Sequence, residues 1–98
     1  MKKGISLQSI VVVSPDQVSA DLGAEAAILQ MKTGIYYGLD VVGSRIWELL
    51  KTPRRVAQIR DLLVREYDVT QEVCEKDLTL LLEDLLKEHL VTITDKGS

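Results

Sequence analysis

The spacing of apolar residues changes once along the chain, at Asp40, and this change limits the possible folds. Before it, apolar residues alternate as in β-strands, the first predicted at residues 18–22; after it, they recur every three to four residues as in amphipathic helices. A chain of 98 residues with 46% apolar residues is long enough for one core and too short for two. We therefore expect an α+β fold that forms a single domain over residues 1–98, with its core at about residues 10–94.

Residues 26–31 and 35–39 are predicted to form a β-hairpin. The connection from Lys32 to Gly34 ends in glycine, which adopts the left-handed conformation of a three-residue turn without strain. Gln30 and Tyr36 then share one face, and the opposite, apolar face is formed by pairs across the strands. These pairs are Met31 with Ile35, Leu29 with Tyr37, and Ala27 with Leu39. The first nine residues have no such pattern and are predicted to be either loosely held or an irregular lead-in.

Three helices are predicted next, at residues 41–51, 55–66 and 70–88, before a short strand at residues 90–94. Proline disfavours helix in the residue before it, so Pro53 follows the end of the first helix, and Thr70 is suited to cap the third. A helix, a tight turn, a longer helix and an extended wing are typical of a winged helix-turn-helix, a three-helix bundle. The arginines expected to face solvent are Arg54, Arg60 and Arg65. The apolar stripe of the third helix is too wide for one contact, so one flank should contact the hairpin or a partner.

Few side chains are suited to catalysis, and we expect no enzymatic activity, no cofactor and no metal. His89 is the only histidine, at the end of a predicted helix, where we expect it to cap the helix or lie in water. Cys74 is the only cysteine, so a disulfide within the chain is excluded, and its place on an apolar stripe predicts a small core residue. The longest apolar run near the N-terminus, residues 10–13, is too short for a signal peptide or membrane span, which favours a soluble, cytoplasmic protein.

The third predicted helix is acidic. Residues 66–98 carry nine acidic and three basic side chains, so the helix that would enter a DNA groove in a winged-helix regulator would repel phosphates. A winged-helix DNA-binding transcriptional regulator remains the alternative to a peptide-binding domain. Asp77 and Asp84 lie seven residues apart on one face, with Leu80 between them. This face is either an ordinary solvated surface or the rim of a site for a partner with apolar anchors and basic residues.

The strand at residues 35–39 is followed directly by a helix. Unless the first strand pairs with it, one edge keeps unpaired amides and carbonyls, and open edges attract extended peptides. The alternative is that the edge is simply short and protected by its lysine and glycine neighbours.

Two consecutive segments resemble a known family. The run from Thr33 to Asp40 (TGIYYGLD), followed by the run from Gly43 to Leu50 (GSRIWELL), is similar to the PqqD-like recognition elements of ribosomal peptide natural-product pathways. Later residues fit the same pattern in order: Val56, Ile59, Tyr67-Asp68-Val69, Asp77-Leu78, Leu81-Leu82, Leu85 and Leu90-Val91. The resemblance covers about residues 17–92, and the freestanding length is closest to the members from lasso-peptide pathways.

The resemblance implies a three-stranded antiparallel sheet on a winged three-helix bundle. It also implies that the leader segment of a precursor peptide docks as an added strand, in a groove between the third strand and the third helix. The residues that would pair through their backbone are Ile35, Tyr36, Tyr37, Gly38 and Leu39. The residues that would line the groove are Asp77, Leu78, Leu81, Asp84 and Leu85, whereas Ile46, Trp47 and Leu49 are assigned to the core.

The same resemblance implies specific partners. These are the leader peptide, commonly anchored by a tyrosine and a proline, a separate leader peptidase and an ATP-dependent macrocyclase, with no nucleic acid and no membrane. Two positions depart from the family pattern. Arg55 replaces a threonine that caps the second helix, and His89 replaces a glycine after the third, so the start of one helix and the left-handed end of the other are in question.

Overall fold

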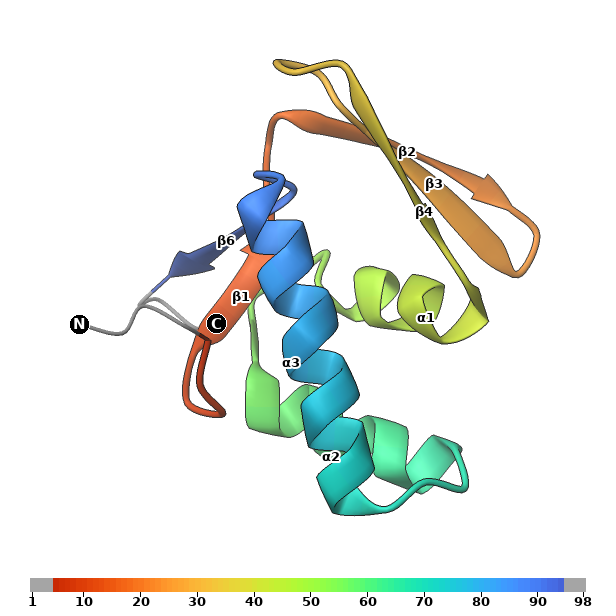
Figure 1. The fold of residues 1–98 in the computed structure, drawn as a ribbon, viewed down its shortest axis with the longest axis vertical. Helices are drawn as coiled ribbons and strands as arrows, with labels where there is room; N and C mark the ends of the chain where they lie inside the picture. Colours follow the sequence, from red (N-terminus) through yellow and green to blue (C-terminus); the bar gives the residue numbers. More distant parts are fainter. Residues whose placement is uncertain (1–4, 95–98) are drawn as a thin grey trace.

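The structure, a computed structural model, describes residues 5–94 and contains three helices and two antiparallel sheets (Figure 1). In chain order the elements are β1 (Ile10–Val13), β2 (Gln17–Leu22), β3 (Glu25–Gln30), β4 (Ile35–Leu39), α1 (Val41–Leu49), β5 (Arg54–Arg55), α2 (Val56–Glu66), α3 (Gln71–Lys87) and β6 (Val91–Thr94). One sheet has the order β2-β3-β4 and the other β5-β1-β6. The predicted α+β class is thus confirmed.

The two sheets lie on different sides of the helices. In Figure 1 the β2-β3-β4 sheet lies beyond α1 and the C-terminal end of α3, whereas β1 and β6 lie beside α3. β4 ends at Leu39 and α1 begins at Val41, so the last strand of the β2-β3-β4 sheet adjoins the helices. This boundary is where the candidate site lies.

The hairpin register differs from the prediction by one residue. The turn has four residues, 31–34, rather than three, and is closed by a hydrogen bond from the Gly34 N–H to the Gln30 carbonyl (2.8 Å). Gln30 therefore pairs with Ile35, and the predicted pairs on the apolar face are wrong: Tyr37 faces Ile28, not Leu29. The expected left-handed conformation of Gly34 is confirmed by its φ of 75°.

The buried side chain of Gln30 explains this register. It is only 1% exposed, its Nε2 donates to the His89 carbonyl oxygen (2.6 Å), and its Oε1 accepts from the Lys32 N–H (2.8 Å). The three-residue turn would have placed Gln30 on the face opposite the apolar one. In the observed register Gln30 instead lies on the inner face beside the apolar side chain of Ile28, with both the nitrogen and the oxygen of its buried amide hydrogen-bonded.

Of the two predictions for the first nine residues, residues 5–9 fit the irregular lead-in and are not loosely held; residues 1–4 lie outside the described residues. Ile5 is buried, and the carbonyls of Leu7 and Ser9 accept hydrogen bonds from Ala57 (3.0 Å) and Val56 (2.9 Å). These carbonyls satisfy amides in the first turn of α2, which have no partner within their own helix. This helix therefore begins normally although Arg55 offers it no capping oxygen.

The ends of α3 are both capped. Thr70 Oγ1 accepts a hydrogen bond from the Val73 N–H (3.2 Å), which confirms the predicted N-cap. At the other end His89 has a φ of 61°, and its N–H and that of Leu90 donate to the carbonyls of Leu86 and Leu85. This is a Schellman motif, so the left-handed cap is present and strained by a non-glycine residue.

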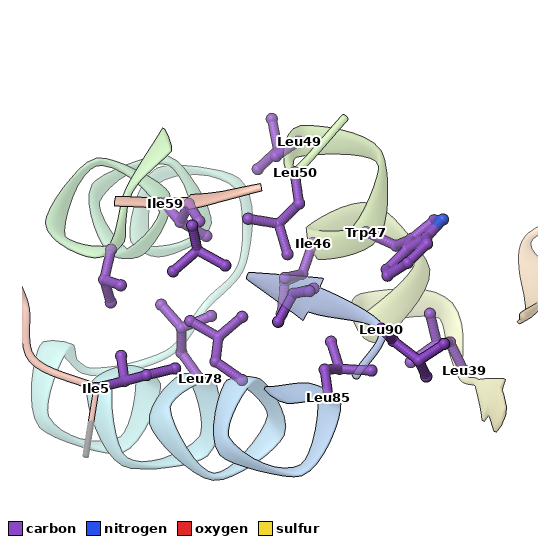
Figure 2. Close-up of a cluster of buried hydrophobic side chains, with 14 of the residues drawn as sticks. Ile5, Leu39, Ile46, Trp47, Leu49, Leu50, Ile59, Leu78, Leu85 and Leu90 are labelled. Carbon is purple, nitrogen blue, oxygen red and sulfur yellow. The ribbon is translucent and has the colours of Figure 1, made fainter. Parts of the chain in front are cut away.

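One hydrophobic core joins the helices to both sheets. Ile46, Trp47 and Leu49 of α1 are buried, as predicted, and Figure 2 shows them in one cluster with side chains from α2 and α3 and with Leu90, which precedes β6. Fully buried leucines and isoleucines at the centre of the cluster are Leu50, Ile59, Leu78, Leu82, Leu85 and Leu90. The wide stripe on α3 leaves Val73 and Leu80 about half exposed.

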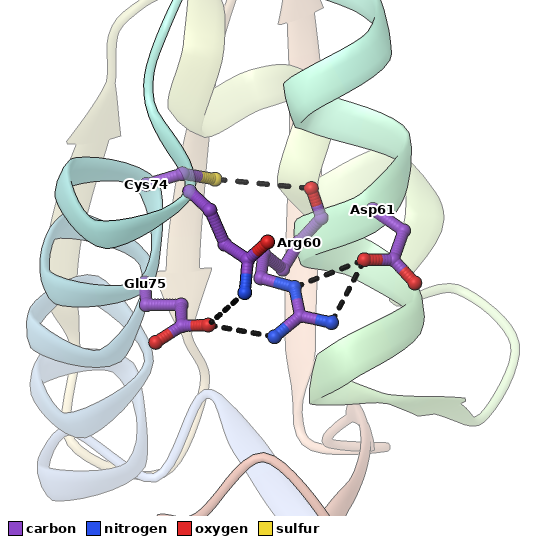
Figure 3. A network of polar contacts seen from close by, with 5 residues as sticks. Arg60, Asp61, Cys74 and Glu75 are labelled. Carbon is purple, nitrogen blue, oxygen red and sulfur yellow. Dashed lines mark hydrogen bonds and ion pairs between the residues drawn. The ribbon is translucent and has the colours of Figure 1, made fainter.

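A polar network also joins α2 to α3 (Figure 3). The prediction that Arg60 faces solvent is wrong, since its side chain is 16% exposed and bonds Glu75 (2.6 Å) and Asp61 (2.8 Å). Arg54 is half-buried and donates to the Leu49 carbonyl, whereas Arg65 is exposed as predicted. The carboxylates of Glu75 and Asp61 both bind the guanidinium, and the aliphatic stem of Arg60 can pack against apolar surface, so Arg60 lies between the helices rather than in water.

Candidate functional site

An open groove of about 640 Å³ lies between β4 and α3. Its walls come from both elements, from the start of α1, and from the end of α2 with the turn that follows. The lining residues are Tyr37, Gly38, Leu39, Asp40, Val42, Gly43, Ile46, Leu63, Tyr67, Val69, Cys74, Asp77, Leu78 and Leu81. The groove therefore lies where the change from strand to helix at Asp40 brings the two halves of the chain together.

One wall of the groove is a strand with a free edge. β4 is the last strand of its sheet, and among the described strands only β3 pairs with it. Backbone groups on an antiparallel strand point alternately toward each side, so the amides of Tyr36 and Tyr37 point toward opposite edges. An extended segment placed in the groove would meet this unpaired row of donors and acceptors.

Close approach of α1 to β4 shapes the adjacent wall. A Cβ atom added to Gly43 would lie 3.1 Å from Leu39 Cδ2 and 3.2 Å from Asp40 Oδ1. Asp40 Oδ1 in turn accepts a hydrogen bond from the Gly43 N–H (2.8 Å), which caps the helix. The helix can thus begin immediately after the strand, with Val42 (41% exposed) at the groove surface.

The groove has an apolar floor and an acidic rim. Leu78 and Ile46 are buried beneath it, and Leu81 is half-buried in its wall. Of the described residues that line it, the charged ones are Asp40 and Asp77, and none is a lysine, arginine or histidine. An apolar floor with carboxylates at its edge suits a ligand that is apolar in part and positively charged in part.

Asp84 extends the acidic rim toward the C-terminal end of α3. The pKa of the Tyr37 phenol is raised from its ordinary value, mainly because burial disfavours the phenolate and secondly because the Asp84 carboxylate lies close to it. Glu88 adds a weaker effect of the same sign. The phenol of Tyr37 thus bridges the space between β4 and the last turns of α3 in its neutral form.

The groove brings most of the predicted site residues together. Tyr37, Gly38, Leu39, Asp77, Leu78 and Leu81 all line it, and Asp84 lies beside Tyr37. Ile35 and Tyr36 lie further along β4, outside the groove, and are 45% and 72% exposed. Leu85 is completely buried in the core and presents no surface to a ligand in this state.

Several lining residues were not predicted. Val42 and Gly43 follow β4 directly, so the abrupt change from strand to helix could have identified them. Leu63, Tyr67 and Val69 are distant from both walls in sequence, and no local pattern places them at the groove. Cys74 also contributes to the lining although its side chain is only 6% exposed, and burial raises the pKa of its thiol. Its predicted place in the core is confirmed.

Two kinds of feature are missing from the described part of the chain. Within residues 5–94 no three side chains of the histidine, cysteine, aspartate or glutamate type are grouped so as to hold a metal ion. No helix in the same range is long and apolar enough to cross a membrane.

The sequence profile of a known family covers both walls of the groove. The family described as coenzyme PQQ synthesis protein D (PqqD) matches residues 25–91, more than half of the chain. The chain belongs to the PqqD family. The similarity to PqqD-like recognition elements predicted from residues 33–50 is therefore confirmed.

This PqqD-family chain is also similar to two solved structures. One, TbiB1 in complex with the TbiA(beta) leader peptide, is 37% identical over 89% of this chain and 99% of that chain, with a TM-score of 0.77. The other, lasso peptide synthetase B1 complexed with the leader peptide, is 19% identical over 84% of this chain and 96% of that chain, with a TM-score of 0.66, and supports the fold alone. None of the curated proteins matches this PqqD-family chain.

Proposed function

We propose that this chain binds the leader segment of a ribosomally synthesised precursor peptide by β-strand addition and presents it to a separate leader peptidase and macrocyclase. The observation that carries the proposal is the free edge of β4 beside an apolar groove of about 640 Å³. The 37% identical relative, which covers 89% of this chain, is described as a complex with a leader peptide, and this description supports the same kind of ligand here.

The backbone of β4 would supply register, and the backbone and the groove together would supply affinity. Each hydrogen bond exchanged with water contributes only about 0.5–1.5 kcal/mol net, and a five-residue strand offers few outward-pointing groups. Burial of apolar surface contributes about 25 cal/mol per Å², so one or two large side chains seated over Leu78 and Leu81 would add about as much affinity as the strand. A leader with apolar anchors at alternate positions fits both requirements.

The proposed contacts follow the two elements. Ile35, Tyr36, Tyr37, Gly38 and Leu39 pair through their backbone, while Asp77, Leu78, Leu81, Asp84 and Leu85 form the α3 side, with Leu85 supporting the floor from below. The chain acts as one domain over residues 1–98 and performs no chemistry on the peptide itself. We also propose that α2, α3 and β6 correspond to a winged helix-turn-helix in which peptide recognition has replaced DNA recognition.

Two proline variants test strand addition. Proline removes one backbone donor, and the amides of Tyr36 and Tyr37 point toward opposite edges. Tyr36→Pro and Tyr37→Pro should therefore divide into one variant that melts normally but binds a synthetic leader peptide weakly, and one that loses thermal stability because the pairing with β3 is broken. Calorimetry supplies affinity and circular dichroism supplies the melting temperature.

The unmodified chain provides the reference for both. It should bind the leader peptide with one-to-one stoichiometry, and mass spectrometry after prolonged incubation should find the peptide intact. If both proline variants remain folded and bind normally, the peptide does not pair with β4. Cleavage of the peptide by the purified chain would contradict the non-catalytic role.

A further inference from the structure

Two carboxylates of α3, Asp77 in the lining of the groove and Asp84 beside Tyr37, have no cationic partner among the described residues. Within residues 5–94 the carboxylates that form ion pairs are Asp16, Glu48, Asp61, Glu66 and Glu75. Neither Asp77 nor Asp84 is among them, although Asp77 lines the groove and Asp84 lies close enough to Tyr37 to raise its pKa. Asp40 on the opposite wall differs, because its Oδ1 is already used to cap α1.

The spacing of these two carboxylates relates to Leu81. Residues 77, 81 and 84 lie on one face of the helix, four and three positions apart. With a rise of 1.5 Å per residue, Asp77 and Asp84 lie about 6 Å and about 4.5 Å along the helix axis from Leu81. The α3 wall thus presents a half-buried apolar side chain with a carboxylate on each side, and of the two Asp84 also interacts with the Tyr37 phenol.

An extended peptide matches this spacing at alternate residues. A strand rises about 3.3 Å per residue, and side chains two positions apart lie on the same face, about 6.6 Å from each other. A peptide whose apolar anchor rests on Leu81 would therefore bring the residues two positions before and two positions after the anchor near Asp77 and Asp84. A carboxylate lies on each side of Leu81, so the expectation holds for either direction of the added strand.

We propose that the groove selects leader segments in which an apolar anchor carries lysine or arginine two positions before it, two positions after it, or at both places. This inference rests on the proposed function and specifies the chemistry of the ligand. Among residues 5–94 no basic side chain lines the groove, so an acidic flank on the peptide would meet only like charge from this part of the chain. Each cationic contact at this solvated rim should raise affinity about two- to five-fold, and less at high salt.

A random library of 12-residue peptides displayed on phage tests the preference whatever the sequence of the natural leader. Peptides captured by the full chain should be enriched in lysine and arginine, and depleted in aspartate and glutamate, at two positions from a shared apolar residue. Synthetic copies of a captured peptide, with each basic residue replaced by glutamine, should bind about two- to five-fold more weakly per replacement. Sodium chloride should weaken the original peptide more than its glutamine copy.

A pair of double variants with the same change of charge identifies the responsible carboxylates. Asp77→Asn with Asp84→Asn should abolish the difference between the basic peptide and its glutamine copy. Glu72→Gln with Glu83→Gln changes two carboxylates of α3 that do not line the groove and should preserve that difference. Captured peptides without basic enrichment, or a difference that persists in the Asp77 and Asp84 variant, would refute the inference alone. Failure to capture any peptide would instead contradict strand addition and leader binding as a whole.

Discussion

Replacement of Gln30 by methionine should destabilise the chain without changing the shape of its core. Methionine is close to glutamine in size and is adaptable in packing, but it offers no donor and no useful acceptor. The change removes the bond from Gln30 Nε2 to the His89 carbonyl (2.6 Å) and the bond that Oε1 accepts from Lys32 (2.8 Å). These two bonds tie the turn of the β3–β4 hairpin to the end of α3.

The expected loss follows from the two bonds. At about 0.5–1.5 kcal/mol each, they contribute about 1–3 kcal/mol to the free energy of unfolding. The Lys32 amide lies in an exposed turn that water can reach, so the larger share of the loss should come from the His89 carbonyl. With a urea dependence of about 2 kcal/mol per M, a loss of about 2 kcal/mol lowers the unfolding midpoint by about 1 M.

Gln17 provides a matched control for the same substitution. It faces Gln30 across the β2–β3 pair, and its Oε1 is buried with no hydrogen-bond partner within residues 5–94. Gln17→Met should therefore be neutral or slightly stabilising, since it removes an unsatisfied polar atom. Urea unfolding followed by circular dichroism measures both variants. If Gln30→Met loses no more stability than Gln17→Met, the buried amide does not hold the hairpin register.

Three further predictions concern single side chains. His89→Gly should raise the free energy of unfolding by about 0.5–1 kcal/mol, because relief of the left-handed strain exceeds the entropy that glycine adds to the unfolded chain. Thermal melts should show no such gain for His89→Ala. Burial raises the pKa of the Cys74 thiol, so the contribution of the thiol to stability is complete below the ordinary thiol pKa and declines above it. Between pH 7 and pH 10 the urea midpoint of Cys74→Ala should therefore fall less steeply than that of the unmodified chain. Asp84→Asn should lower the pKa of Tyr37 only partway toward its ordinary value, because the effect of burial remains. Absorbance at 295 nm should show one tyrosine titrating at lower pH than in the unmodified chain.

The sequence predicted elements whose pattern is local. The helices were placed within about two residues of their observed bounds because amphipathic spacing and caps such as Thr70 lie within each element. The hairpin was found but its register was not, because the register depends on a bond between Gln30 and a carbonyl that is far away in sequence. The short β5 and the anchoring of residues 5–9 likewise depend on partners elsewhere in the chain.

The candidate site follows the same division. Both its main walls were predicted, since the run before Asp40 and the face of α3 each carry a recognisable pattern. The contributions of Leu63 and Tyr67 were missed, because only the packing of α2 against α3 brings them to the groove. Arg60 was placed in solvent for a related reason: a helical pattern gives the angle of a side chain but not the charge of the neighbouring helix.

The pairing of β1 with β6 has a consequence for how the chain is made. Residues 10–13 pair with residues 91–94, so one sheet joins the two ends of the described chain, whereas β2, β3 and β4 pair only with their immediate neighbours. During synthesis on a ribosome, β1 is made before the other strands, its short partner β5 follows midway, and β6 is made only after almost all the remaining residues. Closing so long a loop is entropically costly and slow compared with forming a hairpin. The β2-β3-β4 sheet can therefore form while the chain is still being translated, and the core becomes complete only when β6 is released.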